Sequence, residues 1–540
     1  MLRKLLQYHE PSRRFTFRLE ETEAEKSAVQ TGKKEQKPEE NIHPDIIKNL
    51  QNAKNLLSVP QNGDIVIREF DIVLADRTLH AFLVYADGLA RGDSVNECIL
   101  KPFAYLKHQS LPDGMPMQDF LLHQLLPQSQ AEVKTNAIEL LSSVNFGNCA
   151  VFVDTLTAGY QIDVKGWEHR GIDTPMNEAV IQGPHEGFNE MLRCNTALLR
   201  KSLNTPYLVM ENIALGKTSQ TPSAICYLKN VANSRLVEEV RRRLSQIDVE
   251  YLLSSLDVEQ YIEEATYLPI PQIATTERPD RVCQALVEGR VAIVVNGSSH
   301  VLIVPTTLFD LIASPEDSYL RFPYAALTKI IRLLAIGLAL LAPAVFIAIT
   351  NFHQELMLTD ILFAIASSRA AVPFPSIVEL LLMELSFELI KEAGVRVPGP
   401  VGSTLGIVGG LILGQAAVSA NIVSPIMIIV VAVCGIASFA IPSYSLSFSF
   451  RFTRFLYTAG AAIAGFLGIF TVFFINTMLI ANTKSFGAPY AAPVAPRTRG
   501  NIASLLFDAP IWKKDERPDY LNPKDPSEKA KISRKWLKNN

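Results

Sequence analysis

The sequence predicts a chain in two main parts, an α/β region toward the N-terminus and an all-α polytopic membrane domain after it. Residues 43–325 alternate between helical and strand patterns. Residues 326–482 hold several apolar stretches long enough to cross the hydrocarbon core of a bilayer. Residues 483–540 are charged again, with twelve Lys or Arg residues against six Asp or Glu residues. We therefore expect a soluble α/β domain, a transmembrane helical domain and a charged C-terminal tail.

Composition limits the classes of function. The formal net charge is −3, so no overall positive field indicates nucleic-acid binding. The six cysteines lie far apart and form no CxxC pair, so neither a zinc site nor a disulfide framework is indicated, and we expect no metal and no cofactor. The N-terminus lacks the apolar run of a signal peptide, so we expect the first large domain to stay in the cytosol.

Residues 1–42 are polar and rich in Lys and Glu. They hold too few apolar residues to offset the entropy lost on ordering, so the composition predicts a disordered arm. The arm is either a solvated extension or a binding tail.

Helical and strand patterns alternate through residues 43–265, which favours an α/β fold in two lobes with a boundary near residues 150–185. The predicted helices cover 45–57, 95–106, 117–126, 131–143, 188–203 and 231–244, and the predicted strands cover 64–70, 78–85, 149–154, 159–164, 206–212 and 223–229. Residues 266–325 are expected to form a small third unit, in which strands 290–295 and 300–304 flank Asn296-Gly297, a strong hairpin signal. Helices are predicted on either side of that hairpin, at 278–288 and 306–312.

Four clear spans are predicted in the membrane domain, at 329–350, 401–423, 424–441 and 455–480. Pro373-Phe374-Pro375 separates two shorter helical stretches, 361–371 and 376–391, which form two short helices or a re-entrant hairpin. The basic tail favours the cytosol, so with a cytosolic N-terminal domain the number of crossings is even. We favour four crossings, although this places Arg451 and Arg454 outside; a fifth crossing by 376–391 moves both arginines inside and the tail outside.

Glycines recur at every fourth position of the span 401–423, at Gly402, Gly406, Gly410 and Gly414. On a helix this spacing leaves a stripe without side chains, and in lipid such a stripe lets another helix approach closely. Gln415 adds a polar group at the end of the stripe. The stripe serves either ordinary tight packing within one bundle, or a seam between subunits or a pore-lining surface.

Three acidic residues, Glu379, Glu384 and Glu388, interrupt the apolar region. Ionisable groups at membrane depth are costly and normally face a bundle interior or water. The functional interpretation is a cation path or gate lined by carboxylates. The structural alternative is a helix at the membrane interface, with the acids in solvent or paired with Lys391 or Arg396.

No catalytic constellation is present, so the sequence does not predict an enzyme. Gly216-Lys217-Thr218 is similar to the end of a phosphate-binding loop, but Glu211 stands where that motif needs its first glycine. The nine histidines are scattered and no pair has the spacing of metal ligands.

Several long blocks nevertheless occur in the order found in one family. The chain resembles the A subunits of GerA-type spore germination receptors from about residue 60 to residue 525. The blocks are GPHEGFNE (183–190), LRCNTALLRK (192–201), RPDRVCQALVEGRVAIVVNG (278–297), VLIVPTTLFDLIASPED (301–317), VPFPSIVELLLMELSFELIKEAGVRVP (372–398), GSTLGIVGGLILGQAAVSANIVSPIMIIVVA (402–432) and RPDYLNPKD (517–525). The departures are His185, Gly187 and the long polar arm.

The resemblance implies a multi-pass protein of the spore inner membrane that works with a polytopic B subunit and a lipoprotein C subunit. It implies a role in sensing nutrients and triggering germination, as a homo-oligomeric, nutrient-gated ion channel. No germinant-binding residue can be transferred, and the B subunit is the stronger candidate for first contact with the nutrient. The alternatives are an accessory sporulation membrane protein of the same family without its own germinant, and a secondary transporter.

Overall fold

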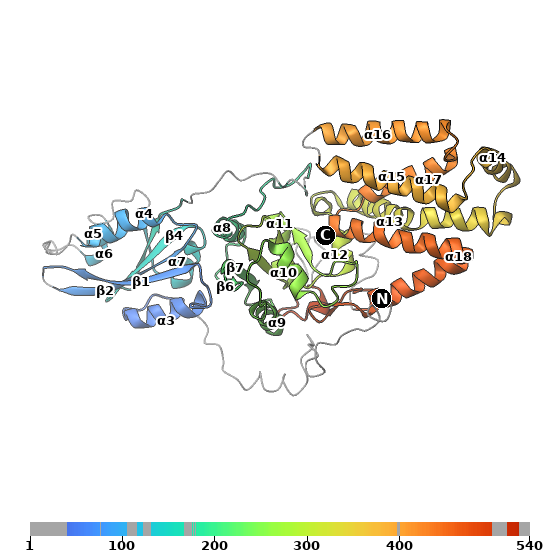
Figure 1. Ribbon diagram of the computed structural model, residues 1–540. Helices are drawn as coiled ribbons and strands as arrows, with labels where there is room; N and C mark the ends of the chain where they lie inside the picture. The colour runs from blue at the N-terminus through green and yellow to red at the C-terminus, as the bar shows by residue number, and fades with distance from the viewer. Residues whose placement is uncertain are drawn as a thin grey trace, which may run out of the picture.

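The structure is a computed structural model that describes residues 40–75, 77–104, 116–122, 131–166, 175, 178, 180–396, 400–498 and 516–528. For residues 395–396, 400–408 and 411 it describes the backbone. The predicted arm 1–42 lies outside the described residues except for its last three positions. The described N-terminal half is α/β and the region that follows is helical (Figure 1).

The first lobe is a five-stranded antiparallel sheet in the order β1-β2-β4-β5-β3. Its strands are β1 (Ile65–Val73), β2 (Thr78–Ala86), β3 (Ala131–Lys134), β4 (Asn148–Val153) and β5 (Gly159–Asp163). Its helices are α3 (Ile46–Leu56), α4 (Gly92–Val95), the π-helix Asn96–Leu100, α5 (Lys101–Ala104), α6 (Met117–Phe120) and α7 (Ala137–Val144). Every residue of the central strand β4 is buried, because apolar clusters cover both faces of the sheet.

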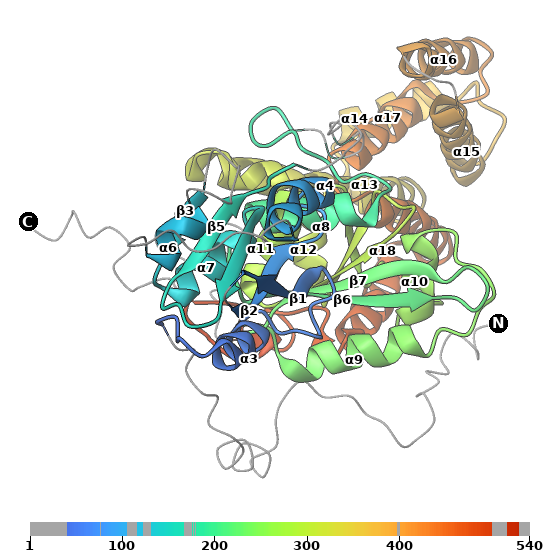
Figure 2. The same ribbon diagram turned by 90° about the vertical axis from the view of Figure 1, so that its left-hand side faces the viewer.

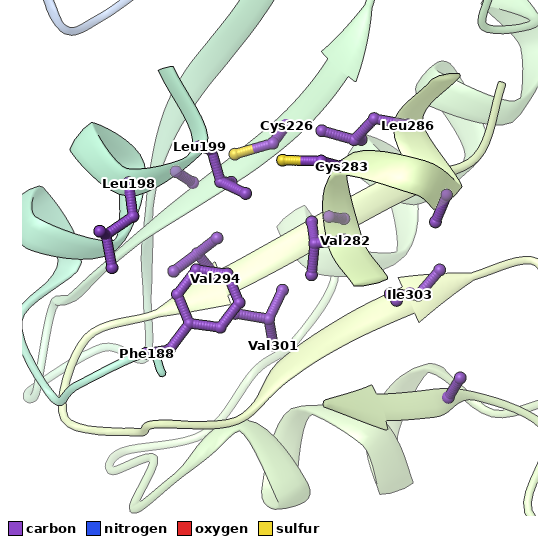
Figure 3. Close-up of a cluster of buried hydrophobic side chains, with 14 of the residues drawn as sticks. Phe188, Leu198, Leu199, Cys226, Val282, Cys283, Leu286, Val294, Val301 and Ile303 are labelled. Carbon is purple, nitrogen blue, oxygen red and sulfur yellow. The ribbon is translucent and has the colours of Figure 1, made fainter. Parts of the chain in front are cut away.

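The second lobe is also a five-stranded antiparallel sheet, in the order β6-β7-β9-β10-β8. Its strands are β6 (Leu208–Leu215), β7 (Thr221–Leu228), β8 (Ala274–Thr276), β9 (Val291–Val295) and β10 (Val301–Val304). Its helices are α8 (Leu192–Ser202), α9 (Ser234–Ser245), α10 (Ser255–Ile262), α11 (Pro279–Glu288) and α12 (Leu308–Ile312). Leucines of α8 and α11 pack on valines of β9 and β10 to form one of its two cores (Figure 3).

The two lobes repeat one topology. In each, a hairpin is followed by helices, an edge strand, a helix and a second hairpin, and the edge strand pairs with the last strand. In each, a glycine with positive φ lies between the helix and the second hairpin, Gly147 in the first lobe and Gly289 in the second. A residue with a side chain is strained in this conformation, so glycine suits both positions. The duplication is a property of the fold that the sequence did not predict.

The structure corrects two predictions for this region. The stretch 131–143 is not one helix, because its first four residues form the edge strand β3 and only the remainder begins α7. Residues 266–325 are not a separate third unit, because β8, β9 and β10 complete the sheet of the second lobe. The predicted hairpin turn at Asn296-Gly297 does connect β9 to β10.

A buried charge network joins the lobes. Both Nε and Nη2 of Arg200, on α8, donate to the carboxylate of Asp64 at 2.6 Å, at the start of the first sheet. The same guanidinium donates to the side-chain oxygens of Asn62 and Asn145 at 3.0 and 2.7 Å. Arg200 and Asp64 are both almost fully buried. Each charge is therefore neutralised and hydrogen-bonded, which is what a buried ion pair requires.

The helical region contains α13 (Phe322–Asn351), α14 (Thr359–Arg369), α15 (Ser376–Arg396), α16 (Pro400–Ser419), α17 (Pro425–Phe439) and α18 (Tyr444–Asn482). Most of these helices run side by side along the long axis of the molecule in Figure 1. Within the described part of the chain, α13 and α18 are long and apolar enough to cross a membrane, and α17 is a shorter apolar helix.

Helix α18 reverses direction in its middle, so the predicted single span 455–480 is wrong. Ala464 and Gly465 leave helical geometry, and Gly465 has φ of +59°. A Cβ atom placed on Gly460 lies 2.9 Å from the carbonyl oxygen of Gly468, although eight residues of continuous helix rise about 12 Å. The two halves of α18 therefore form a tight helical hairpin (Figure 1).

Candidate functional site

Helix α15 carries the acidic residues that the sequence singled out; Glu379 faces α14 and the start of α17, and Glu384 and Glu388 face α18. Glu379 and Glu384 are almost fully buried, whereas Glu388 is partly exposed. At the start of the helix, Oε1 of Glu379 lies 3.4 Å from Nε of Arg369 on α14. Its Oε2 accepts a 3.0 Å hydrogen bond from the backbone N–H of Ser424, which precedes α17. Glu379 thus ties α14, α15 and the α16–α17 connection together.

The central contact joins α15 to the first half of α18. Oε1 of Glu384 lies 3.1 Å from Nε of Arg454, and the side chain of Arg454 is 3% exposed. Nη1 of Arg454 also donates to Sγ of Cys434 on α17 at 2.9 Å. The Cys434 thiol in turn donates to the carbonyl of Ala339 on α13 at 3.1 Å. One guanidinium therefore connects four helices.

One turn further along α15, Glu388 has two arginine partners. Its Oε2 accepts a 2.7 Å hydrogen bond from Arg451, and its Oε1 lies 3.6 Å from Arg454. Lys391 then donates to Oγ of Ser438 at 2.7 Å, and its ammonium lies 4.5 Å from the centre of the Phe439 ring. Around Glu384 and Glu388 three cations thus face two carboxylates.

This arrangement bears on both interpretations of the acids. Glu379 and Glu384 are not in solvent, and the guanidiniums that lie against the three acids are those of Arg369, Arg451 and Arg454. A path lined by free carboxylates would attract cations, but here each carboxylate already faces a guanidinium. What the cluster can do, by its geometry, is hold α15 against α17 and α18. We name Glu384, Glu388, Arg451, Arg454 and Lys391 the α15 ion cluster.

The glycine stripe lies on α16, which packs chiefly against α15 and stands at the edge of the bundle (Figure 2). A Cβ atom added at Gly410 would meet nothing within 4 Å, and at Gly414 it would be in ordinary contact with Ile428 at 3.7 Å. Gln415 is exposed. The surroundings of Gly402 and Gly406 lie outside the side chains that the structure describes. At Gly410, therefore, no side chain among the described residues fills the stripe.

Close helix contacts also occur at glycines that were not singled out from the sequence. A Cβ atom on Gly468 would overlap the carbonyl oxygen of Gly460, and one on Gly435 would overlap the ring of Phe387. The first pair lets the two halves of α18 touch, and the second lets α15 approach α17. The available signal was the run Gly460, Gly465 and Gly468 in an apolar segment, which is typical of close helix contacts in membranes.

The end of α18 leads back to the second lobe. The following residues form a small hairpin, β11 (Lys484–Ser485) and β12 (Ala488–Pro489). The hydroxyl of Ser485 donates to the carbonyl of Gln272 at 2.7 Å, and the hydroxyl of Tyr490 donates to the carbonyl of Pro271 at 2.7 Å. The guanidinium of Arg243 lies 4.1 Å from the centre of the Phe486 ring at the hairpin turn. We name residues 484–490 the docked hairpin.

The long apolar helix α13 is attached to the same lobe. Nη1 of Arg332, on α13, lies 2.8 Å from the carboxylate of Asp317 and donates to the carbonyl of Ile312 at the end of α12. The C-terminal residues 516–528 return as well, because Lys524 donates its backbone N–H to the carbonyl of Val231. The second lobe is thus fixed to both the first and the last of the long helices.

No other chemistry is evident in the described part of the chain. Among those residues, no group of three or more His, Cys, Asp or Glu side chains is placed to hold a metal ion. Gly216, Lys217 and Thr218 lie in the turn between β6 and β7, not between a strand and a helix, so they do not form a phosphate-binding loop.

Comparison with known proteins gives a consistent result. The family model described as Bacillus/Clostridium GerA spore germination protein matches residues 51–520. Spore germination protein KA of Bacillus subtilis (strain 168) is 36% identical over 91% of this chain and 90% of its own length. Spore germination protein A1 of the same strain is 39% identical over 74% of this chain and 83% of its own.

Two further relatives complete the comparison. An uncharacterized membrane protein, YfkQ of Bacillus subtilis (strain 168), is 36% identical over 88% of this chain and 91% of its own. The crystal structure of the N-terminal domain of the A subunit of the Bacillus megaterium spore germinant receptor GerK3 aligns with 50% of this chain and 97% of that domain, at 27% identity and a TM-score of 0.35. The extent of the family match and the identity to its relatives show that the chain belongs to the GerA spore germination protein family.

Proposed function

We propose that this chain is the A-type subunit of a nutrient germinant receptor in the spore inner membrane, and that several copies form an ion channel that triggers germination. Membership of the GerA family supports the germination role, and the names of the relatives point to the same process. The partners that this role implies are a B-type polytopic subunit, a C-type lipoprotein subunit and the lipid bilayer.

The paths of the helices support a multi-pass topology with six crossings, rather than the four favoured from the sequence. The end of α13, the start of α15, the α16–α17 connection and the tip of α18 meet at one end, since Ser376 hydrogen-bonds Asn351 and Gly465 packs on Phe352. The other ends of α15, α17 and α18 meet near Ser438, which Lys391 and Ser447 both contact. Helices α13, α15, α16 and α17 and the two halves of α18 then alternate in direction.

An even number of crossings agrees with the contacts of the C-terminal tail. The docked hairpin and residues 516–528 pack on the second lobe, which puts these parts of the tail on the same side of the membrane as the lobes in this proposal. The basic composition of 483–540 favours the cytosol for that side.

The observation that carries the channel proposal is the open face of α16. This helix has glycines on a stripe that the same chain leaves uncovered at Gly410, and it stands at the edge of the bundle. In lipid such a face suits packing against a helix of another copy. The α15 ion cluster sets the position of the hairpin formed by α15 and α16. In this proposal Glu379, Glu384 and Glu388 position the pore helix, and their pairing with arginines makes a direct cation-binding role secondary.

Deletion of the gene tests the receptor role. Mutant spores are challenged with single amino acids and sugars, and release of potassium ions is followed over time. Loss of the response to one nutrient class supports the proposal. A uniform delay with every nutrient favours an accessory protein instead, an alternative suggested by the similarity to an uncharacterized membrane protein.

A second experiment tests the channel. The purified chain is reconstituted in vesicles, and ion flux is compared with uptake of a labelled nutrient. Channel activity predicts flux that Gly410→Leu abolishes together with the oligomer, while the soluble lobes keep their fold. Saturable uptake of the nutrient without ion flux contradicts the proposal and favours a secondary transporter.

A further inference from the structure

The second lobe has an exposed apolar surface around α10. Tyr251, Leu253, Leu256, Tyr261 and Tyr267 are each between 45% and 79% exposed. They are five of the ten strongly exposed large apolar side chains that the structure describes between residues 40 and 318. We name these five residues the α10 patch. Clusters of this kind on a soluble surface mark interaction sites, and tyrosines are typical of their centres.

The patch is built on ordered structure. The inner side of α10 is buried through Val258 and Ile262, and Leu256 and Tyr261 are exposed on the two flanks of that side. The backbone N–H of Leu253 donates to the carboxylate of Asp257 at 2.8 Å, which holds the preceding segment on the first turn of α10. Helix α10 lies on the outside of the molecule (Figure 2).

The rim of the patch is acidic. Residues 244–277 contain no Lys or Arg. Asp248, Glu250, Asp257, Glu263 and Glu264 belong to this stretch, and among the described residues Lys217 lies 2.5 Å from Asp248 and Arg243 lies 3.0 Å from Glu264. Without Glu263, whose pKa burial raises to about 7, four carboxylates against two cations give a local charge of −2. An acidic rim repels a second copy of the same patch and also the anionic lipids of a membrane surface.

The first eighteen residues of the chain have the complementary chemistry. Residues 1–18 carry five cations, Arg3, Lys4, Arg13, Arg14 and Arg18, against one anion, Glu10, which is a net charge of +4. They also carry large apolar side chains, Leu2, Leu5, Leu6, Tyr8, Phe15 and Phe17. The 21 residues from 19 to 39 reach about 70 Å when extended. This exceeds the diameter of about 50 Å expected for a compact unit the size of the two lobes.

We propose that the α10 patch is the docking site of residues 1–18 of the same chain. The apolar side chains of the segment cover the tyrosines and leucines of the patch, and its arginines face the acidic rim. The second lobe also holds the docked hairpin at the end of α18. In this proposal the N-terminal segment lies on the lobe that is connected to the long helices. The proposal does not depend on whether the chain conducts ions.

Cross-linking in the full-length chain in nanodiscs tests the proposal. Thr16→Cys is combined with Gln260→Cys on the exposed side of α10, in a Cys98→Ser background, and treated with a bis-maleimide. A matched control pairs Thr16→Cys with Gln51→Cys on α3, which is also exposed. We expect the 16–260 yield to exceed the 16–51 yield at least fivefold, and to fall as salt is raised to 0.5 M. Equal yields, or a product that joins two chains, overturn the proposal.

Two sets of variants locate the contact. The triple variant Tyr251→Ser, Leu256→Ser, Tyr261→Ser is expected to reduce the 16–260 yield at least fivefold, and Ile47→Ser on α3 is the control. The second set combines Arg13→Glu, Arg14→Glu and Arg18→Glu, which alter no residue of the folded lobes. It is expected to reduce the 16–260 yield by the same factor. Yields that neither set changes contradict the proposal. The thiol introduced by Thr16→Cys is also labelled with and without vesicles of anionic lipid. If it is protected from labelling only when the vesicles are added, the proposal is contradicted and the segment binds the membrane instead.

Discussion

Nε of Arg454 on α18 lies 3.1 Å from Oε1 of Glu384 on α15, and both side chains are almost fully buried. The two residues are seventy positions apart in the sequence. Burying two charges costs several kcal/mol for each ion, and their attraction repays this only while both remain. The pair therefore acts as a unit, and removal of one partner differs from removal of both.

Arg454→Leu is expected to destabilise the helical region by about 3–5 kcal/mol, because it leaves Glu384 buried without a cation. The double variant Glu384→Leu, Arg454→Leu is expected to recover most of the loss, since Glu388 keeps Arg451 as its partner. Thermal loss of helical circular dichroism in detergent measures both. A double variant that is less stable than Arg454→Leu would show that the pair is not the source of the effect.

Two glycines provide a matched test of where helices touch. Gly468→Ala is expected to disrupt the α18 hairpin, because the new Cβ atom overlaps the carbonyl oxygen of Gly460. The backbone must move at this contact, and overpacking of this kind costs about 1–3 kcal/mol or more. Gly410→Ala meets nothing within 4 Å among the described residues of the chain and is expected to leave monomer stability unchanged.

The comparison is made on the monomer in detergent and on the assembled protein in the membrane. If α16 forms the seam between copies, Gly410→Leu lowers the amount of oligomer without altering the melting temperature of the monomer. Equal destabilisation of the monomer by Gly410→Ala and Gly468→Ala would contradict the packing described here.

Arg200 provides a test of the connection between the lobes. Arg200→Met leaves the carboxylate of Asp64 buried without its bidentate partner, so we expect a loss of about 3–5 kcal/mol in the free energy of unfolding. Arg193→Met is the control, because Arg193 and Asp87 form a 3.4 Å pair that is half exposed. Exposed pairs contribute about 0–1 kcal/mol. Similar losses for both variants would mean that the buried network does not hold the lobes together.

The sequence carried enough information for most elements of the lobes. Strand alternation and turn chemistry are local, so the hairpin at Asn296-Gly297 and the helices near α9 and α11 followed directly. Two short elements of the second lobe, α10 and β8, were not predicted. Helix α10 has no side-chain cap at Ser254, and β8 has three residues, so neither produces a periodic signal. Strand β3 has four residues and was absorbed into a helical pattern.

The candidate site was predicted in its residues but not in its partners. Glu379, Glu384 and Glu388 stood out because carboxylates are rare among apolar residues. Their arginines come from α14 and α18, and no local rule links positions so far apart. The reversal of α18 was hidden for another reason. Its tip packs on Phe352 and His353, so apolar residues continue through the turn and no polar loop marks it.

The stability of the second lobe is expected to depend on pH through Glu259. Burial raises the pKa of this carboxyl from 4.5 to about 8, with a smaller contribution from the charge of Glu263. Burial also raises the pKa of Glu263 to about 7. The folded state therefore binds more protons than the unfolded state between about pH 4.5 and pH 8, and the free energy of unfolding falls as pH rises through this range.

Glu259→Gln removes the larger part of this dependence. We expect it to stabilise the chain at pH 8 by on the order of 2 kcal/mol and to have almost no effect at pH 5. Unfolding of the full chain in detergent at several pH values gives the slope. Glu238→Gln, an exposed change on α9, is the control and should leave the slope as it is in the wild type. A slope that Glu259→Gln does not alter would contradict the assignment.

The docked hairpin provides the test of how the lobes communicate with the helices. Ser485 and Tyr490 hydrogen-bond the carbonyls of Gln272 and Pro271, and Phe486 lies under Arg243. Tyr490→Phe removes one buried hydrogen bond and leaves the Pro271 carbonyl without its donor, at a cost of about 1–3 kcal/mol. Phe486→Ala removes a buried ring, at about 3–5 kcal/mol.

If the hairpin transmits a change in the second lobe to α18, both variants should assemble in the membrane and respond less to nutrient than the wild type. The exposed Phe146→Ala, in the first lobe, is the control with an unchanged response. Tyr490→Phe is the more informative variant because it keeps the ring and the packing and alters one contact. A full nutrient response from Tyr490→Phe and Phe486→Ala spores with normal protein levels would show that the signal does not pass through this hairpin. The attachment of Arg332 to Asp317 at the start of α13 would then be the connection to examine.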